Sequence, residues 1–390
     1  MITIFTTTYN RGYIIENLYY SLKSQTCKDF EWVVIDDGSI DNTEDLFHKW
    51  EIETSEFPIK YKKVINGGKH RAINLGVNMA ATDAFFIVDS DDYLVENAIE
   101  QVQKWFQTIC GNSQYAGVSG LKGYSKDSPI GGWGIFSGKY IDATNLERAK
   151  YGLLHDKAEI YKTSFLKKYP FPEFEGENFL TEGVVWNKIA LEGYKIRWYK
   201  EIIYICDYLD DGLTRCGYKR SIQNPKGYMS YLKLMLQIYG EEYGSKLIFG
   251  FYFVLRSDNN NIFSCQKKMQ ITLQEANKFE KTYQQMLIEM RKYFENRNIK
   301  NIAIYGLGNV GNAFLAIANN LNLNIKYAID LRQIKNLKIP VYLPDEKKPP
   351  VDAVVITLKN YNKQVENNLL TFFANHIVYW KDISIKYWID

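Results

Sequence analysis

The first 125 residues alternate short apolar runs with segments of helical periodicity. The apolar runs cover residues 2–6, 31–36, 59–64 and 84–88. Between these runs, and after the last one, apolar residues recur every three or four positions, which is the spacing of a helix buried on one face. Because strands and helices alternate, the pattern predicts a parallel sheet with helices on both faces.

Polar turns follow three of the predicted strands. They are Thr8-Tyr9-Asn10, Asp36-Asp37 and Asp89-Ser90-Asp91-Asp92. Parallel sheets bind ligands at the carboxyl ends of their strands, so these turns are expected to meet at one edge. Three carboxylates within four positions are costly unless a cation neutralises them. The alternative is a helix N-cap, although a cap needs a single Asp.

The pattern changes twice further along the chain. Residues 125–215 contain loops and a helix-like stretch, residues 216–297 are helical and rich in Lys and Tyr, and a new strand begins near Lys300. We therefore expect an α/β domain over 1–215, a helical linker or subdomain over 216–297, and a small α/β domain over 298–390.

Charge, apolar segments and cysteines indicate in which compartment the protein is expected. The 390 residues carry a net charge of +3, which gives no case for a nucleic-acid partner. The N-terminus lacks a signal peptide, and no apolar stretch reaches about 18 residues, so we expect a cytoplasmic protein. The cysteines are odd in number and form no CxxC pair, which favours free thiols in a reducing compartment. They are Cys27, Cys110, Cys206, Cys216 and Cys265.

Four segments taken together resemble family 2 glycosyltransferases, which have the GT-A fold. These segments are Thr6–Arg11, Ser21–Thr43, Asn66–Val77 and Val88–Asp92. The resemblance covers roughly the first 215 residues. It implies an inverting, metal-dependent hexosyltransferase that takes a sugar from a nucleotide-sugar donor.

The resemblance assigns the donor site residue by residue. It implies that Asp91 and Asp89 bind Mn²⁺ or Mg²⁺, that Asp89 and Ser90 face the ribose and diphosphate, and that a later loop adds Asp211. The base, expected to be uracil, would lie near the first two turns, and the donor near Lys69 and Asn74. The base-site residues are Thr8, Tyr9, Asn10, Asp36 and Asp37. Alternatives remain open, namely a core role for Tyr9, a solvated turn at Asp36-Asp37 and a surface position for Lys69.

An inverting transfer also needs a general base. The family commonly places a Glu-Asp pair at the start of a helix, and here Glu182 is followed by Gly183 where the Asp would stand. Glu182 is therefore the candidate base, and the alternative is a carboxylate favoured by the helix dipole. Glu177 and Asp156 are the reserves, and the resemblance places Asp156 near the donor sugar or the acceptor.

A separate motif opens the last domain. Gly306-x-Gly308-x-x-Gly311 follows a strand, and Asp330 ends the next one. This context resembles Rossmann-like modules that bind NAD or another nucleotide. Tight packing of the strand against the helix could also require these glycines, in a structural or assembly module.

The expected function is sugar transfer to a hydroxyl of a glycan or a lipid-linked oligosaccharide. The resemblance suggests bacterial capsule, teichoic acid or other surface polysaccharide synthesis. Because such acceptors lie at the inner membrane face, the helices of residues 216–297 could lie against lipid as a peripheral contact, or could simply connect the domains. A homo-oligomer is left open. The rival hypotheses are a sugar nucleotidyltransferase and a non-catalytic nucleotide-binding or oligomerising protein.

Overall fold

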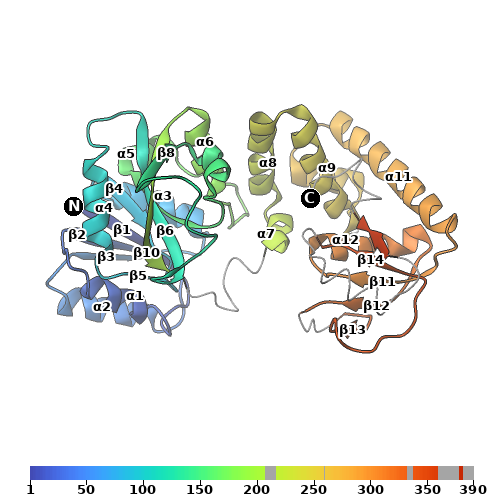
Figure 1. Ribbon diagram of the computed structural model, residues 1–390, viewed down its shortest axis with the longest axis horizontal. Coiled ribbons are helices and arrows are strands. Elements are labelled where there is room, and N and C mark those ends of the chain that lie inside the picture. The colour runs from blue at the N-terminus through green and yellow to red at the C-terminus, as the bar shows by residue number, and fades with distance from the viewer. Residues whose placement is uncertain (207–216, 259, 332–336, 359–376, 381–390) are drawn as a thin grey trace. The chain divides into compact units, whose positions relative to one another are not determined.

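The computed structural model describes residues 1–206, 217–258, 260–331, 337–358 and 377–380 (Figure 1). The chain divides into two compact units, Met1–Leu234 and Met235–Asp390. The boundary falls within helix α8 (Pro225–Tyr239). The three-part division expected from the sequence stays a prediction.

Four parallel strands begin the sheet of the first unit. Its order starts β3-β2-β1-β4, and each strand lies within two residues of the predicted bounds. The strands are β1 (Ile2–Thr8), β2 (Phe30–Asp36), β3 (Ile59–Lys63) and β4 (Ala84–Ile87). The parallel α/β arrangement predicted for this part of the chain is confirmed.

Beyond β4 the sheet is mixed, with both parallel and antiparallel pairs. Strand β9 (Lys157–Lys162) lies antiparallel between β4 and β6 (Tyr115–Ser125), and β10 (Lys195–Ile205) is parallel to β6. Three short strands complete the sheet, namely β5 (Tyr93–Leu94), β7 (Ser128–Pro129) and β8 (Tyr140–Ala143). Insertion of β9 is a long-range pairing that local periodicity does not encode.

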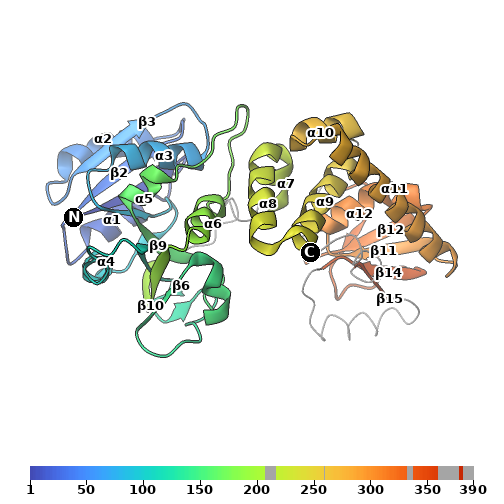
Figure 2. The same cartoon turned by 90° about the horizontal axis from the view of Figure 1, so that it is seen from above.

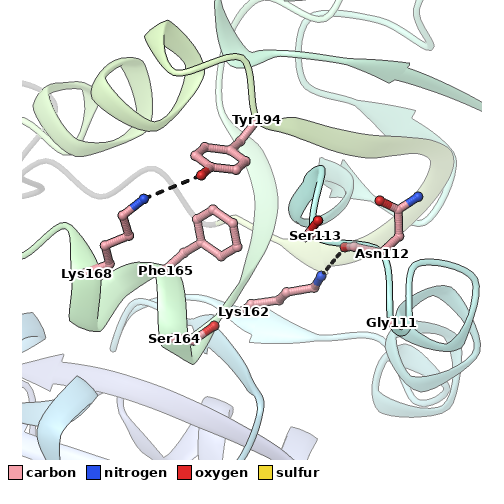
Figure 3. Close-up of a pocket in the computed structure, with 8 residues that line it drawn as sticks. All are labelled: Gly111, Asn112, Ser113, Lys162, Ser164, Phe165, Lys168 and Tyr194. Atoms are coloured by element: carbon pink, nitrogen blue, oxygen red, sulfur yellow. Dashed lines mark hydrogen bonds between the residues drawn. The ribbon is translucent and has the colours of Figure 1, made fainter.

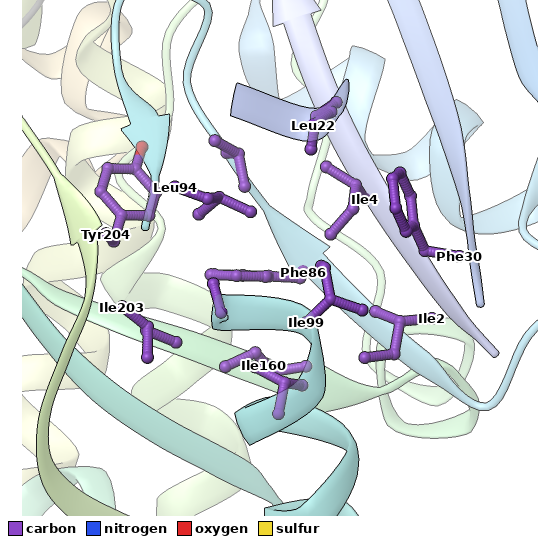
Figure 4. Packing of buried hydrophobic residues seen from close by; sticks show 14 of the residues in the cluster. Ile2, Ile4, Leu22, Phe30, Phe86, Leu94, Ile99, Ile160, Ile203 and Tyr204 are labelled. Carbon is purple, nitrogen blue, oxygen red and sulfur yellow. The ribbon is translucent and has the colours of Figure 1, made fainter. Parts of the chain in front are cut away.

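Helices cover both faces of this sheet, as predicted. Ile2 and Ile4 of β1 pack with α1 (Glu16–Lys23), α2 (Thr43–Glu53) and α4 (Ala98–Gln107). Figure 4 shows this core around Ile4, Phe86 and Ile99. Phe5 points to the opposite face, where it packs with α3 (Lys69–Met79), α5 (Thr163–Lys168) and α6 (Gly183–Leu191). A short 3₁₀ helix, Asn145–Tyr151, precedes β9.

Helices fill residues 216–297, as predicted, within the part that the structure describes. They are α7 (Gly217–Gln223) and α8, followed in the second unit by α9 (Glu241–Ser257), α10 (Ile262–Met269) and α11 (Leu273–Glu295) (Figure 2). Helix α9 contacts both α10 and α11. The second unit therefore starts with a layer of packed helices.

The second unit continues with a five-stranded sheet in which every pair is parallel. Its order is β13-β12-β11-β14-β15. The elements are β11 (Asn301–Tyr305), α12 (Asn309–Ile317), a 3₁₀ turn (Ala318–Leu321), β12 (Asn324–Ile329), β13 (Val341–Tyr342), β14 (Ala353–Ile356) and β15 (Ile377–Tyr379). The Rossmann-like character of this unit stays a prediction.

The structure bears on the expected state of the cysteines and on the expected lack of membrane-spanning helices. Cys27, Cys110, Cys206 and Cys265 are free thiols, and Cys216 lies outside the described residues. Within the described ranges, no helix combines the length and the apolar character that crossing a bilayer requires.

Candidate active site

The turns predicted to converge do lie at one edge of the first sheet. Thr8 at the end of β1 is in register with Asp36 at the end of β2, and Phe5 is in register with Ile87 at the end of β4. We call this margin, where the strands β1–β4 end, the carboxyl edge. Its loops carry most of the candidate residues.

Asp89 is held by two lysines at the carboxyl edge. Lys69 Nζ lies 2.6 Å from Asp89 Oδ1, and Lys122 Nζ lies 3.9 Å from Asp89 Oδ2. Burial alone would raise the pKa of Asp89, but the two ammonium groups outweigh it and hold this pKa at about 2. Asp89 is therefore ionised at neutral pH.

Tyr204 of β10 joins Asp89 to Asp92. Its hydroxyl accepts the Asp89 backbone N–H at 2.9 Å and donates to Asp92 Oδ2 at 2.8 Å. Burial and the charge of Asp89 raise the pKa of Asp92 to about 7. Strand β5 follows these aspartates, and α4 begins only at Ala98 after Asn97. The helix N-cap alternative is therefore wrong.

Asp91 forms no ion pair with another described residue. Burial, then the charge of Asp89, raise its pKa, although the more distant charges of Arg11 and Lys69 lower it. A desolvated carboxylate beside another anion is stabilised by a divalent cation, so Asp91 fits a metal ligand. No group of three Asp, Glu, His or Cys able to hold a metal occurs in the described ranges, and Asp211 lies outside them.

Glu182 reaches the same cluster from the start of α6. Lys69 Nζ lies 2.7 Å from Glu182 Oε1, so one ammonium bridges Glu182 and Asp89. The Glu182 side chain makes no capping hydrogen bond at the helix. A Cβ added to Gly183 would meet nothing closer than 3.7 Å, so packing does not demand glycine there. The structure thus connects the candidate base Glu182 to Asp89 through the Lys69 ammonium.

Two residues of this cluster, Lys122 and Glu159, were missed by the sequence prediction. Lys122 lies on β6 with its ammonium 4.0 Å from the Tyr204 ring centroid. Glu159 lies on β9, and its pKa is raised by burial, although Arg148 is 3.5 Å away. The available signals were charges inside apolar strand sequences, "GVSGLKGY" and "KAEIY". Such a charge must find a partner, but the sequence does not say which one.

The two acids at the end of β2 make internal contacts. Asp36 accepts hydrogen bonds from Ser39 N at 2.7 Å and from the Tyr61 hydroxyl. Asp37 accepts from Gly67 N at 2.7 Å and Gly68 N at 2.9 Å, which fixes the start of α3. Both are buried, so the solvated-turn alternative is wrong. Their contact with a base stays a prediction.

Asn74 and Asn10 hold loops around the site. The Asn74 side chain accepts from Phe171 N and donates to Phe171 O, both at 2.9 Å. Asn10 Oδ1 accepts from Ile40 N at 2.8 Å, which ties the loops after β1 and β2 together. Direct donor contacts by these two asparagines also stay predictions.

The remaining candidates differ in burial. Thr8 Oγ1 is buried and has no hydrogen-bond partner in the described part of the chain. Tyr9 is 48 % exposed, so the core alternative for it is wrong. Ser90 is buried and Asp156 is exposed. The reserve base Glu177 instead accepts from Lys226 N at 2.9 Å and Gly227 N at 2.8 Å, at the start of α8.

The glycine motif of the second unit has its own geometry. Gly306 has a φ of +93°, and a Cβ on Gly311 would lie 2.0 Å from the Gly306 carbonyl oxygen. Leu307 N donates to Asp330 Oδ2 at 2.7 Å. Backbone conformation and packing therefore explain glycine at positions 306 and 311. They do not explain it at position 308, where a Cβ would meet nothing within 4 Å. Nucleotide binding here stays a prediction.

Part of the first unit is similar to a known protein family. Residues 3–168 match the profile of Glycosyl transferase family 2. Glycosyltransferase GlyG of Streptococcus pneumoniae is 32 % identical over 27 % of this chain and 35 % of its own length. The GalNAc(5)-diNAcBac-PP-undecaprenol beta-1,3-glucosyltransferase of Campylobacter jejuni is 25 % identical over 60 % of this chain and 74 % of its own length.

A solved structure is also similar. Staphylococcus aureus TarS 1-349 in complex with UDP-GlcNAc is 17 % identical, with a TM-score of 0.48, over 73 % of this chain and 91 % of that chain. The match to GlyG spans only about a third of that relative. Residues 3–168 therefore match glycosyltransferase family 2, and this match includes the strands β1–β4 whose ends form the carboxyl edge.

Proposed function

We propose that the protein is an inverting glycosyltransferase that moves a sugar from a UDP-sugar to a hydroxyl of a glycan or lipid-linked oligosaccharide. The observation that carries this proposal is the Lys69 ammonium, which lies 2.6 Å from Asp89 and 2.7 Å from Glu182. Asp91, which makes no ion pair with a described residue, is close enough to Asp89 for its pKa to be raised by that charge. In this proposal Asp89 faces the donor and Glu182 faces the acceptor, and both contact the Lys69 ammonium.

The nucleotide end of the donor would lie against the loop after β1. The buried Thr8 Oγ1 has no partner among the described residues, and a ribose or base could satisfy it. The half-exposed ring of Tyr9 offers a face on which a base can stack. Buried Asp36 and Asp37 would keep this pocket in shape.

The diphosphate would lie between Asp91 and the lysines. Asp91 would hold Mn²⁺ or Mg²⁺, with Asp89 and Asp211 as the further ligands proposed from the family resemblance. The cation would neutralise charge on the leaving diphosphate. Lys69 and Lys122 would lie close to that place, because both contact Asp89. Attraction between unit charges 4 Å apart is worth about 4 kcal/mol at an effective dielectric of 20.

Glu182 would accept the proton of the acceptor hydroxyl. The acceptor oxygen forms a bond to the anomeric carbon, the bond from that carbon to the diphosphate breaks, and the nucleoside diphosphate leaves. In the free protein, Lys69 competes for Glu182 as an ion-pair partner. An incoming diphosphate offers Lys69 a second anion, which would free Glu182 to act as a base only when the donor is bound.

The acceptor is proposed from the comparisons. The Campylobacter jejuni relative is named for glucosyl transfer to an undecaprenol-linked oligosaccharide. We therefore propose a role in bacterial surface polysaccharide synthesis, with capsule as one such product, and a peripheral contact with the inner membrane face. Assembly as a homo-oligomer is tested by light scattering of the purified protein.

A donor panel tests the proposal. With Mn²⁺ present, a UDP-sugar should be hydrolysed or transferred. Asp91→Asn should lose this Mn²⁺-dependent activity. Glu182→Gln should lower kcat by about 10²–10⁴-fold with donor affinity retained. Asp83→Asn removes an exposed carboxylate at the opposite end of β4 and should change neither property. Activity that is independent of metal and indifferent to both site variants would refute the proposal.

A further inference from the structure

A second pocket lies in the first unit, away from the candidate active site. Its volume is about 410 Å³, within the range of small-molecule sites. Three segments line it: the turn at 111–113, the end of β9 with α5, and Tyr194 before β10 (Figure 3). These segments are far apart in sequence, and the sheet brings them together.

Strand directions place this pocket at the opposite edge of the sheet. Lys162 pairs with Ala84 at the start of β4, whereas the candidate site follows the end of β4. Residues 111–113 and Tyr194 precede the parallel strands β6 and β10. Because β9 is six residues long, the two sites are separated by about 17 Å or more. The pocket is therefore not part of the donor site.

Two aromatic rings form the apolar part of the pocket. Phe165 and Tyr194 meet edge to face, with ring centroids 4.7 Å apart and planes at 81°. Both side chains are only partly buried. Figure 3 shows the rings side by side between the side chains of Lys162 and Lys168. Exposed ring faces of this kind suit the C–H face of a sugar ring.

Polar groups around the rings are cations and neutral donors. Lys162 Nζ donates to Asn112 O at 2.7 Å, and Lys168 Nζ lies 3.4 Å from the Tyr194 hydroxyl. Ser164 adds a hydroxyl, and the described residues that line the pocket include no carboxylate. Glu192 lies 3.5 Å from Lys168 and offsets part of its charge. Lys162, together with the part of the Lys168 charge that Glu192 does not offset, favours an anionic group between them, with sugar hydroxyls at Asn112 and Ser164.

We propose that this pocket binds a negatively charged sugar unit of the glycan, as a second glycan-binding site remote from catalysis. The inference rests on the proposed function, because a polymer-extending enzyme would meet a glycan long enough to reach both edges. The unit stacks on Phe165 and Tyr194 while its carboxylate or phosphate pairs with Lys162 and Lys168. Its effect is on affinity for long acceptors and not on the chemical step.

Calorimetric titration of the full chain with three probes of matched length tests this. The probes are a hyaluronan hexasaccharide, a ribitol phosphate hexamer and neutral chitohexaose. At least one anionic probe should bind fivefold or more tightly than chitohexaose, and the pair of anionic probes distinguishes carboxylate from phosphate. Tyr194→Ala should weaken that binding about tenfold, and Lys168→Met should remove the preference for charge.

Lys167→Met is the matched control, because Lys167 is exposed on the same helix but does not line the pocket. It should bind like the wild type. If Tyr194→Ala lowers the melting temperature, Ser164→Trp fills the pocket from its exposed rim and replaces it as the test. Equal binding of all three probes, or binding untouched by these variants, would overturn the proposal. Tighter binding of UMP that is lost in Tyr194→Ala would also overturn it, in favour of a nucleotide site.

Failure of this inference is separable from failure of the proposed function. The probe titrations need neither donor nor metal, so they stand even if no sugar is transferred. Conversely, Tyr194→Ala should leave donor hydrolysis and transfer to a monosaccharide glycoside unchanged. For a long anionic acceptor the variant should raise KM about tenfold at unchanged kcat.

Discussion

Lys69 is the residue on which the charges of the candidate site converge. Its ammonium lies within 2.7 Å of both Asp89 and Glu182, which belong to segments 93 positions apart. Without this cation the two carboxylates would face each other partly desolvated, which raises the free energy of the ionised site. A lysine placed in this way organises the site in the absence of ligand and remains available to a diphosphate.

His70, next to Lys69, should make stability depend on pH. Burial, then the Arg71 charge, lower its pKa to about 4, against about 6.5 in an unfolded chain. Between pH 6.5 and 4, His70 is therefore protonated in the unfolded state but neutral in the folded state. The free energy of unfolding falls as the pH is lowered through this range. The loss should reach about 2–3 kcal/mol at pH 4.5.

Urea unfolding of wild type and His70→Gln at pH 7.5 and 4.5 measures this loss. Other titrating groups, including Glu173, which faces His70, are shared by both proteins. The stability difference between them should therefore shift in favour of the variant at pH 4.5. An identical pH dependence in both proteins would contradict the prediction.

Gly68 should be intolerant of any side chain. Its φ is +94°, and a Cβ there would lie 1.8 Å from the Asn178 carbonyl oxygen. Gly68→Ala should therefore cost several times the approximately 1 kcal/mol of backbone strain alone. Gly176→Ala is the matched control, because Gly176 has a φ of +77° and open space around it. Equal losses of unfolding free energy in urea would show that the close approach is absent.

Among the elements, β9 contributes residues at both edges of the first sheet. It runs antiparallel between β4 and β6 and brings Glu159 beside the cluster built on β4. Its other end carries Lys162 to the second pocket. One short strand thus connects the two edges of the sheet, because its pairing fixes which residues face each edge.

In the turn from β11 to α12, two glycines should differ in how well they tolerate alanine. Gly311→Ala should destabilise the second unit by at least 2 kcal/mol, because its Cβ would lie 2.0 Å from the Gly306 carbonyl oxygen. Gly308→Ala should change stability by less than about 0.5 kcal/mol, since its φ of −69° and open surroundings suit alanine. Thermal unfolding of both variants checks the order. A larger loss for Gly308→Ala would reverse the interpretation of the turn.

Each of the two units contains a hydrophobic cluster of its own within the described residues. The clusters around β1 lie in the first unit, and the cluster around Ala303 and Tyr327 lies in the second. Every residue of the candidate active site described here belongs to the first unit. Damage to the second core should therefore leave the carboxyl edge intact.

Phe314→Ala tests this separation. Phe314 is fully buried between Phe294 and Trp380, so its truncation should cost about 3–5 kcal/mol. Hydrogen exchange should accelerate in β11 and β12 and remain unchanged in β1 and β2. Phe263→Ala, which removes an exposed ring in the same unit, should have no effect. Acceleration in β1 would mean that the two cores unfold together.

The sequence alone was enough to find β1–β4, their helices and the acids at the strand ends. These features follow from local periodicity and from residues next to one another in the chain, and the family motifs are local as well. The same holds for the helices of residues 216–297 and the start of the last sheet. Local signals also placed Glu182 at a helix start.

The three-dimensional fold alone supplied the partners of those residues. Tyr204 reaches Asp89 and Asp92 across more than 110 positions, and Lys122 and Glu159 come from strands whose order no local pattern gives. It also gave Asp37 and Asn74 internal hydrogen bonds, whereas the sequence suggested ligand contacts for both and a solvated turn as the alternative for Asp37. Charge and periodicity act over a few residues, whereas sheet order is fixed by the burial of the entire chain, so only folding decides which charges meet.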